Sequence, residues 1–125
     1  MPKHVLSVGQ CVPDQAAIAR FLKSAFDVVI DEADTGPAAL DLVRKQRFDL
    51  VLINRKLDAD YSDGEDILRA IKADPAIAAT PVMLVTNYPE HQDNAVALGA
   101  VRGFGKAELG RSDVVARLEP FLGAT

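Results

Sequence analysis

The sequence is poor in cysteine, in long apolar segments and in runs of basic residues. Its single cysteine, Cys11, cannot form an internal disulfide, and the N-terminal MPKHVLSVGQ lacks the long apolar stretch of a signal peptide. The longest apolar runs, such as 50–53 and 82–85, fall far short of the roughly 20 residues that span a bilayer. No run of Lys and Arg exceeds two residues, which argues against binding of nucleic acid or of an anionic membrane surface. We therefore predict a cytoplasmic protein that contacts neither nucleic acid nor membrane.

Several motifs of enzyme active sites are also missing. No G-x-G-x-x-G follows the first apolar run, and there is no G-x-S-x-G nucleophile elbow. Residues 100–107 resemble a phosphate-binding P-loop only superficially, because its first Gly and its Ser or Thr are absent. His4 and His91 are too far apart to form a metal or catalytic cluster. These absences favour a protein that is not an enzyme.

What the chain does have is the composition and periodicity of one packed domain. Its 125 residues are 49% hydrophobic and 26% charged, with 18 acidic and 14 basic side chains and a formal net charge of -4. These values suit a single domain over 1–125, with an ordered core of about 3–122. Apolar, β-rich runs alternate with helical periodicity five times. The strands are predicted at 4–8, 28–30, 50–53, 82–85 and 101–105.

A helix is predicted after each strand. Helix starts are indicated at Pro13, Thr35, Asp63, Glu90 and Ser112, and Gly99 is expected to end the fourth helix. Apolar residues at helical spacing are expected to face the core, namely Ile18, Phe21, Leu22 and Ala25, then Ile67, Ala70 and Ile71, and finally Val114, Leu118 and Phe121. Five β-then-α units with short connections predict an α/β fold, a doubly wound five-stranded parallel sheet between layers of helices.

In such a sheet the functional crevice lies at the carboxyl ends of the strands. The stretches FDLVLINRKL (48–57), DGEDILRAIK (63–72), PVMLVT (81–86) and LGAVRGFGK (98–106) surround that edge. Together they make the chain, over almost its whole length, similar to the CheY-like receiver domains of bacterial response regulators. The resemblance implies a flavodoxin-like three-layer sandwich and a role in two-component or phosphorelay signalling.

The resemblance also identifies a site, most of which has been lost. Receivers carry an acidic pair after the first strand, a phosphoacceptor Asp ending the third, Ser or Thr ending the fourth and Lys ending the fifth. Thr86 and Lys106 match the last two, but the acidic pair falls on Gly9 and Gln10 and the phosphoacceptor on Asn54. Mg²⁺ prefers charged oxygen ligands, and the phosphoryl acceptor must be an anionic carboxylate. We therefore expect no Mg²⁺ or other cofactor and no ordinary phosphorylation.

The switch and the nearby loop depart from the family as well. The family's switch aromatic falls on Gly103, while the adjacent Phe104 would point to the opposite face of its strand. Ala107 replaces the proline that usually follows the Lys, which favours a trans peptide bond. The segment 57–64 looks about two residues longer than is typical of the family.

Three side chains at this edge have structural interpretations. Lys106 is expected to reach Asp58, Asp60 or solvent, and Thr86 is interpreted either as a retained residue of the family pocket or as a cap of the following turn. Cys11, with no basic neighbour in sequence, is expected to be inert. The weak metal candidates Asp58, Asp60 and Asp63 are better interpreted as a solvated acidic loop, with Asp63 capping the next helix.

These features predict a pseudo-receiver, a phosphorylation-independent protein-interaction module. Its partner would be a histidine kinase, an effector domain or a second copy of the chain. By resemblance, the contact face would lie on 90–122 and include His91, Val96, Arg102, Phe104, Arg111 and Arg117. Two alternatives remain open, a receiver phosphorylated at Asp58 or Asp60 and a sensor that binds a small anion beside Lys106.

Overall fold

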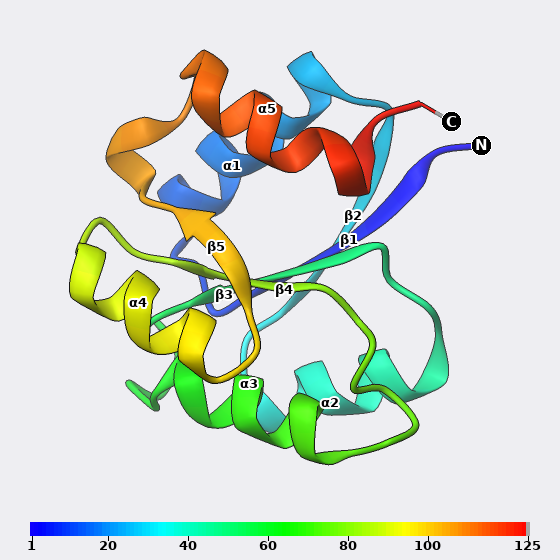
Figure 1. Ribbon diagram of the computed structural model, residues 1–125, viewed down its shortest axis with the longest axis vertical. Helices are drawn as coiled ribbons and strands as arrows, with labels where there is room; N and C mark the ends of the chain where they lie inside the picture. The colour runs from blue at the N-terminus through cyan, green and yellow to red at the C-terminus, as the bar shows by residue number, and fades with distance from the viewer. Residues whose placement is uncertain (125) are drawn as a thin grey trace.

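A computed structural model describes residues 1–124 and contains one parallel sheet with helices on both faces (Figure 1). The strands are β1 (Lys3–Val8), β2 (Val28–Ala33), β3 (Leu50–Asn54), β4 (Val82–Val85) and β5 (Val101–Phe104). The helices are α1 (Val12–Ala25), α2 (Gly36–Lys45), α3 (Gly64–Ala73), α4 (Pro89–Ala97) and α5 (Ser112–Leu122), with a 3₁₀ turn at Lys106–Glu108. The strand order is β2-β1-β3-β4-β5, the doubly wound order of flavodoxin-like folds. The predicted fold class is confirmed.

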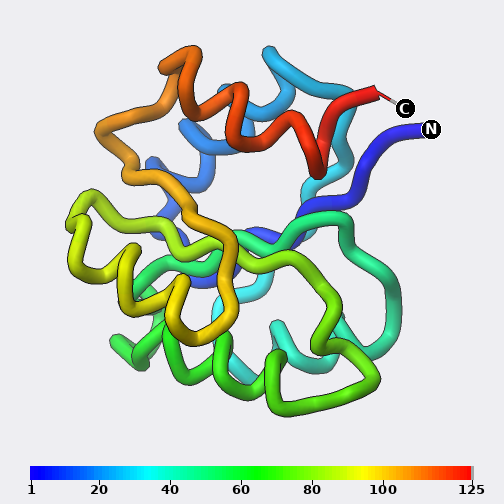
Figure 2. Tube along the Cα trace, in the orientation of Figure 1, coloured from blue at the N-terminus to red at the C-terminus, as the bar shows by residue number. Residues whose placement is uncertain are grey.

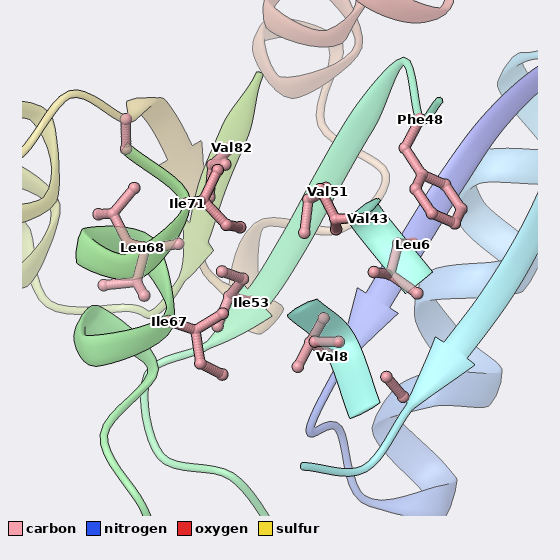
Figure 3. Close-up of a cluster of buried hydrophobic side chains, with 14 of the residues drawn as sticks. Leu6, Val8, Val43, Phe48, Val51, Ile53, Ile67, Leu68, Ile71 and Val82 are labelled. Atoms are coloured by element: carbon pink, nitrogen blue, oxygen red, sulfur yellow. The ribbon is translucent and has the colours of Figure 1, made fainter. Parts of the chain in front are cut away.

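The core has two halves, one on each face of the sheet. Helices α1 and α5 cover one face, and α2, α3 and α4 cover the other (Figure 1). On the second face, Leu6, Val51, Ile53, Ile67 and Ile71 belong to one buried cluster, in which Ile53 lies beside Ile67 (Figure 3). On the first face, the buried cluster is built from Val5, Ile18, Leu22, Leu52, Phe104, Val114 and Leu118. Strand β3 contributes to both halves, which explains why its sequence shows no polar alternation.

Strand β2 is longer than the predicted 28–30. It pairs with β1 over six residues, from Lys3↔Val28 to Val8↔Ala33. Because β2 lies at the edge of the sheet, its polar residues Asp31 and Glu32 reach solvent without leaving the ladder. Asp31 and Glu32 are therefore strand residues, although the strand was predicted to end before them.

The ends of α1 and α5 differ from their prediction. Ala25, expected in the core, is exposed at the last turn of α1. The N-cap of α5 is Arg111, so that Ser112 is its first helical residue rather than its cap. Leu122 is buried near the end of α5, whereas Phe121 is only half-buried and packs at the margin of the core. None of the helices within 1–124 is long and apolar enough to cross a membrane.

The two ends of the chain lie together near the amino-terminal ends of the parallel strands. Figure 2 shows both ends on the same side of the molecule, and Met1, Leu122 and Ala124 line one hollow there. The carboxyl ends of the strands, where the candidate site lies, are at the opposite edge.

Candidate functional site at the carboxyl edge of the sheet

Asn54, at the end of β3, uses its amide to hold the neighbouring strand end. Its Nδ2 donates a hydrogen bond to the carbonyl oxygen of Gly9 at 3.1 Å. The backbone N–H of Asp58 donates to the same oxygen at 2.9 Å. A carboxylate could only accept, so it could not replace the first of these bonds. The neutral amide of Asn54 therefore helps to hold the residue after β1 against the loop that follows β3.

Gly9 occupies a backbone position that excludes a carboxylate side chain. Its φ is +74°, a left-handed conformation that glycine adopts without strain. A Cβ there would overlap the side chain of Leu57 and would lie 3.1 Å from its Cα. Gln10, the second position of the expected acidic pair, offers a neutral amide. Its Oε1 is buried and has no hydrogen-bond partner within 1–124.

The residues at this edge do not fit a magnesium ion. Within 1–124 there is no group of three or more His, Cys, Asp or Glu placed to share a metal. Asp63 caps α3 by accepting from the Glu65 N–H at 2.9 Å, as the sequence predicts. Asp60 accepts from the Ser62 hydroxyl at 2.6 Å, which lowers the pKa of that carboxyl, and Asp58 is exposed. The acidic loop thus serves local structure, and one neutral buried oxygen on Gln10 is a poor ligand set for a hard cation.

Lys106 pairs with a carboxylate that sequence reasoning missed. Its Nζ lies 2.7 Å from Oδ2 of Asp14 in the first turn of α1, and the predicted partners Asp58 and Asp60 are not used. The hydrogen bond from Lys106 lowers the pKa of Asp14, and a hydrogen bond from the Cys11 thiol lowers it further. The sequence did contain one signal for this pair, which is the position of Asp14. An acidic residue that opens the helix after β1 lies at the same edge of the sheet as the end of β5.

Three of the predicted site residues line one cavity. Asn54, Thr86 and Lys106 border a hollow of about 310 Å³ at this edge, which we call the edge hollow. The Thr86 hydroxyl accepts from the Tyr88 N–H at 3.3 Å, so Thr86 caps the turn that follows β4. The residues that line the edge hollow are Asn54, Arg55, Lys56, Val85, Thr86, Asn87, Tyr88 and Lys106. Gly9, Gln10 and the loop aspartates are outside this set.

Comparison with known proteins decides which family this arrangement represents. The family model for the response regulator receiver domain matches residues 10–116. The chain belongs to this family. The receiver fold is shared with chemotaxis protein CheY4 of Vibrio cholerae, with a TM-score of 0.77 and 21% identity over 98% of this chain and 100% of that one. It is also shared with the signal receiver domain of a DNA-binding response regulator from Colwellia psychrerythraea, with a TM-score of 0.80 and 25% identity over 94% and 96%.

A third structural neighbour was solved with a metal ion at its site. It is the receiver domain of the sensor histidine kinase PA1611 from Pseudomonas aeruginosa, whose structure has a magnesium ion coordinated in the active site cleft. The two chains are 21% identical over 99% of this chain and 100% of that one, with a TM-score of 0.72. A shared fold does not by itself imply a shared ligand set, because site chemistry depends on individual side chains.

The switch region of this receiver domain is built around a glycine. A Cβ on Gly103 would overlap the carbonyl oxygen of Leu84, so no aromatic side chain fits that position on this backbone. Phe104 is fully buried and packs edge-on against Phe21, with ring centroids 6.5 Å apart on the α1/α5 face. This confirms that Phe104 points away from the switch position. Within 1–124 no peptide bond is cis, so the bond before Ala107 is trans as predicted.

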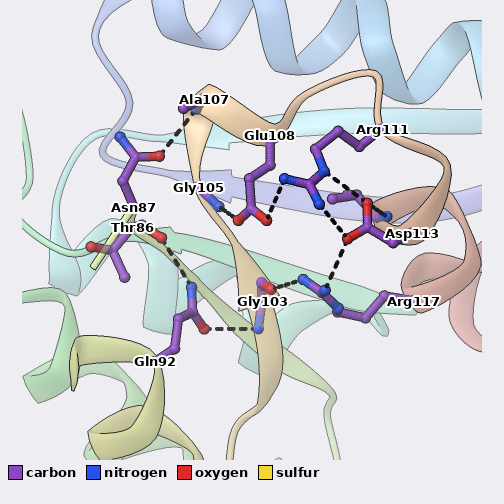
Figure 4. Close-up of polar contacts among 11 residues, drawn as sticks. Thr86, Asn87, Gln92, Gly103, Gly105, Ala107, Glu108, Arg111, Asp113 and Arg117 are labelled. Carbon is purple, nitrogen blue, oxygen red and sulfur yellow. Dashed lines mark hydrogen bonds and ion pairs between the residues drawn. The ribbon is translucent and has the colours of Figure 1, made fainter. Parts of the chain in front are cut away.

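Gln92, which sequence reasoning did not single out, connects three backbone segments at the switch. Its Nε2 donates to the carbonyl oxygen of Leu84 at 2.9 Å. It also donates to the carbonyl oxygen of Thr86 at 3.2 Å (Figure 4). Its Oε1 accepts from the N–H of Gly103 at 2.9 Å. The side chain is 5% exposed, so these bonds are shielded from water. Helix α4 is thereby fixed to β4 and β5.

The predicted interaction face needs correction at Phe104. Phe104 cannot contact a partner, because it is buried in the core. Arg117 is half-buried and donates to the carbonyl oxygen of Gly103 (Figure 4). The helical spacing of Arg117 and the strand position of Phe104 could not show which neighbours cover them.

The remaining residues of that face lie at the surface with internal partners of their own. Arg102 pairs with Asp93 at 2.8 Å, and Arg111 pairs with Asp113 at 3.0 Å. Val96 is 43% exposed. His91 is half-buried, and its ring meets the Tyr88 ring edge-on at 5.7 Å. Of the predicted face, Val96, Arg102 and Arg111 therefore lie exposed at the surface.

Proposed function

We propose that this receiver domain is a phosphorylation-independent pseudo-receiver that works in cytoplasmic signalling by binding a protein partner. It catalyses no reaction and uses neither Mg²⁺ nor another cofactor. The observation that carries the proposal is the state of the phosphoacceptor position. Asn54 stands there with its amide already donating to Gly9, and Gly9 lies where an acidic side chain would meet Leu57. Both the nucleophile and the metal ligands of phosphoryl transfer are thus replaced.

The placement of the loop aspartates gives little support to a displaced phosphoacceptor. Asp60 lies at a different hollow, with Asp63 and Asp66, and its carboxylate is occupied by Ser62. Asp58 is exposed and does not line the edge hollow with Thr86 and Lys106. A phosphoryl group on either residue would therefore lie away from the Thr86 hydroxyl and the Lys106 ammonium group, which match the family's site.

The first test of the proposal is chemical. Incubation with phosphoramidate and Mg²⁺ is expected to add no phosphoryl mass to the wild type. Asn54→Asp alone is expected to gain little, because Gly9 and Gln10 still supply no charged metal ligand. Intact-protein mass spectrometry measures both. A phosphoryl adduct on the wild type that disappears in Asp58→Ala or Asp60→Ala would overturn the proposal and identify a displaced acceptor.

We place the partner surface on α4, β5 and α5, around the exposed residues Val96, Arg102 and Arg111. The partner is a histidine kinase, an effector domain or a second copy of the chain. Supporting this choice, the backbone of β5 is held on both sides by Gln92 and Arg117, so the surface keeps one shape without a chemical signal.

Charge reversal tests this surface. Arg102→Glu is expected to weaken capture of the partner by about tenfold. The partner group that faces the Arg102 cation in the wild type would face an anion in the variant. Arg69→Glu on α3 is the matched control, since Arg69 is also exposed and paired, 3.1 Å from Asp66. Quantitative affinity capture with both variants measures the effect. An equal loss of capture in both variants, or no loss in either, would mean that the partner binds a different surface.

A further inference from the structure

The surface between helices α2 and α3 contains a hollow of about 270 Å³, which we call the acidic hollow. The two helices lie side by side on one face of the sheet (Figure 1), and the loop that precedes α3 supplies part of the lining. Four other surface hollows each include at least one Lys or Arg, but the described lining of this one includes no cation. Its lining includes the apolar residues Pro37, Leu40 and Ile67 and the carboxylates of Asp60, Asp63 and Asp66.

The walls that the two helices supply are apolar. Pro37 and Leu40 belong to α2, and Ile67 belongs to α3. Ile67 is 5% exposed and belongs to the core, whereas Leu40 is half-buried at the margin of the same cluster and Pro37 is exposed. Apolar surface continuous with the core is thus left open to solvent here. A metal ion would gain nothing from such walls, whereas an aliphatic side chain would gain free energy by leaving water.

The carboxylates of the acidic hollow are short of cationic partners. Within 1–124, neither Asp60 nor Asp63 forms an ion pair, and their side-chain oxygens accept hydrogen bonds only from the same loop and the first turn of α3. Asp66 pairs with Arg69 at 3.1 Å, but both side chains are exposed, and exposed ion pairs are weak. The three carboxylates therefore present a negative potential that a cation from outside the chain can meet.

An exposed aromatic ring lies in the same loop. Tyr61 follows Asp60 and is 76% exposed. Its φ is +58°, and no other residue within 1–124 except glycine has a positive φ. Its N–H donates to the carbonyl oxygen of Leu57 at 2.8 Å, which helps to hold the loop in this shape. The loop therefore displays a tyrosine beside the hollow, and tyrosine is enriched where proteins contact one another.

We propose that the acidic hollow binds a short segment of a partner protein in which an aliphatic side chain lies next to Lys or Arg. The aliphatic side chain enters between Leu40 and Ile67, and the neighbouring cations meet the three carboxylates. The volume suits a single side chain, because pockets that enclose whole small molecules measure roughly 300–1,000 Å³. Charge complementarity favours a basic segment over a second copy of this chain, whose net charge is -4.

This inference goes beyond the proposed function, because it gives the domain a second partner. No residue of α4, β5 or α5 is among the described residues that line the acidic hollow. The partner surface around Val96, Arg102 and Arg111 and the acidic hollow are therefore separate, and the domain can hold two proteins at the same time.

The test is an amide NMR titration of the whole chain with the peptide KRLLKR, acetylated and amidated at its ends. Saturable shifts are expected at Leu40, Asp63 and Ile67 at millimolar peptide or below. The peptide KRSSKR carries the same charge without the leucines. It is expected to bind about tenfold more weakly or worse, because the apolar walls then gain no buried partner.

The contribution of charge is tested with the triple variant Asp60→Asn/Asp63→Asn/Asp66→Asn. Asparagine caps a helix as well as aspartate does, so α3 is expected to keep its N-cap. This variant is expected to bind KRLLKR about tenfold more weakly. The control removes three exposed carboxylates away from the hollow and is expected to change the affinity by less than about twofold, because salt screens distant charges. That control is Asp27→Asn/Asp93→Asn/Glu119→Gln.

The contribution of the apolar wall is tested with Leu40→Ala, and Leu42→Ala is its matched control. Both leucines are half-buried in α2 and pack against the same cluster, but only Leu40 is among the described residues that line the hollow. Leu40→Ala is expected to weaken binding of KRLLKR by about fivefold, and Leu42→Ala is expected to leave it unchanged. Urea unfolding checks that the two variants lose similar stability.

The proposal is overturned if the shifts fail to saturate, if KRSSKR binds as tightly as KRLLKR, or if either variant responds as its control does. The same shifts, appearing with rising protein concentration and no peptide, would identify a second copy as the occupant and would also overturn it. Arg102→Glu is expected to leave peptide binding unchanged. A failure of the acidic hollow and a failure of the partner surface on α4, β5 and α5 are therefore distinguishable.

Discussion

Replacing Gly103 with alanine is expected to lower the free energy of unfolding by about 3 kcal/mol or more, because the backbone of β4 leaves no room for a methyl group. A Cβ at this position overlaps the Leu84 carbonyl oxygen and lies 3.2 Å from the Leu84 N and C atoms. Backbone atoms of a central strand cannot move aside as a flexible side chain would. The register between β4 and β5 shifts between Met83 and Val85, which brings Gly103 against Leu84.

Gly36→Ala is the control for that substitution. A Cβ on Gly36 would meet only the side chain of Ile67, at 3.4 and 3.7 Å, within the first turn of α2. This change is expected to be neutral or stabilising by about 0.5 kcal/mol, since alanine favours the helix. Urea unfolding measures both variants. If Gly103→Ala is as stable as the wild type, β5 can retreat from β4, and an aromatic switch residue would be sterically permitted there.

Replacing Gln92 with leucine is expected to cost about 3 kcal/mol, despite the similar size and greater hydrophobicity of leucine. The change leaves the N–H of Gly103 and the carbonyl oxygen of Leu84 without these hydrogen bonds in a buried setting. Each buried polar group left unpaired costs roughly 1–3 kcal/mol. The bond to the carbonyl oxygen of Thr86 is lost as well. We also expect faster amide exchange at Gly103, because that N–H is otherwise held by the side chain.

Gln46→Leu separates this effect from a general response to leucine. Gln46 is exposed, and its amide reaches only Asp31, at 3.4 Å, so the change is expected to stay within about 0.5 kcal/mol. Unfolding in urea and hydrogen exchange by NMR measure both variants. Unchanged exchange at Gly103 in Gln92→Leu would mean that this side chain does not hold α4 on the sheet, and the proposed constitutive surface would lose its main support.

Much of the site could be predicted residue by residue. The positions of Asn54, Thr86 and Lys106 at strand ends followed from the strand pattern, and the structure brings all three to one hollow. Two residues that define the local structure were missed. Asp14 and Gln92 are ordinary polar residues of helices, and only their long-range contacts set them apart.

Phe104 shows how a single residue can support two incompatible sequence arguments. Strand alternation placed it on the face opposite the switch, while the family's contact surface placed it toward a partner. The structure confirms the first and excludes the second, because α1 and α5 cover that face and Phe21 lies against the ring. A strand position predicts which face a side chain occupies, but not whether a helix covers it.

The sequence by itself determined the strand and helix alternation, the fold class and the residue types at the strand ends, such as Gly9, Gln10 and Asn54. These are properties of periodicity and residue type, which are local. Only the tertiary structure decided that Lys106 pairs with Asp14 and that Gly9 and Gly103 exclude larger residues. It also gathered Arg55, Lys56 and Lys106 around one hollow. Such features depend on which strand ends and backbone atoms become neighbours in space, and residues 92 or 50 positions apart in the chain carry no local sign of that proximity.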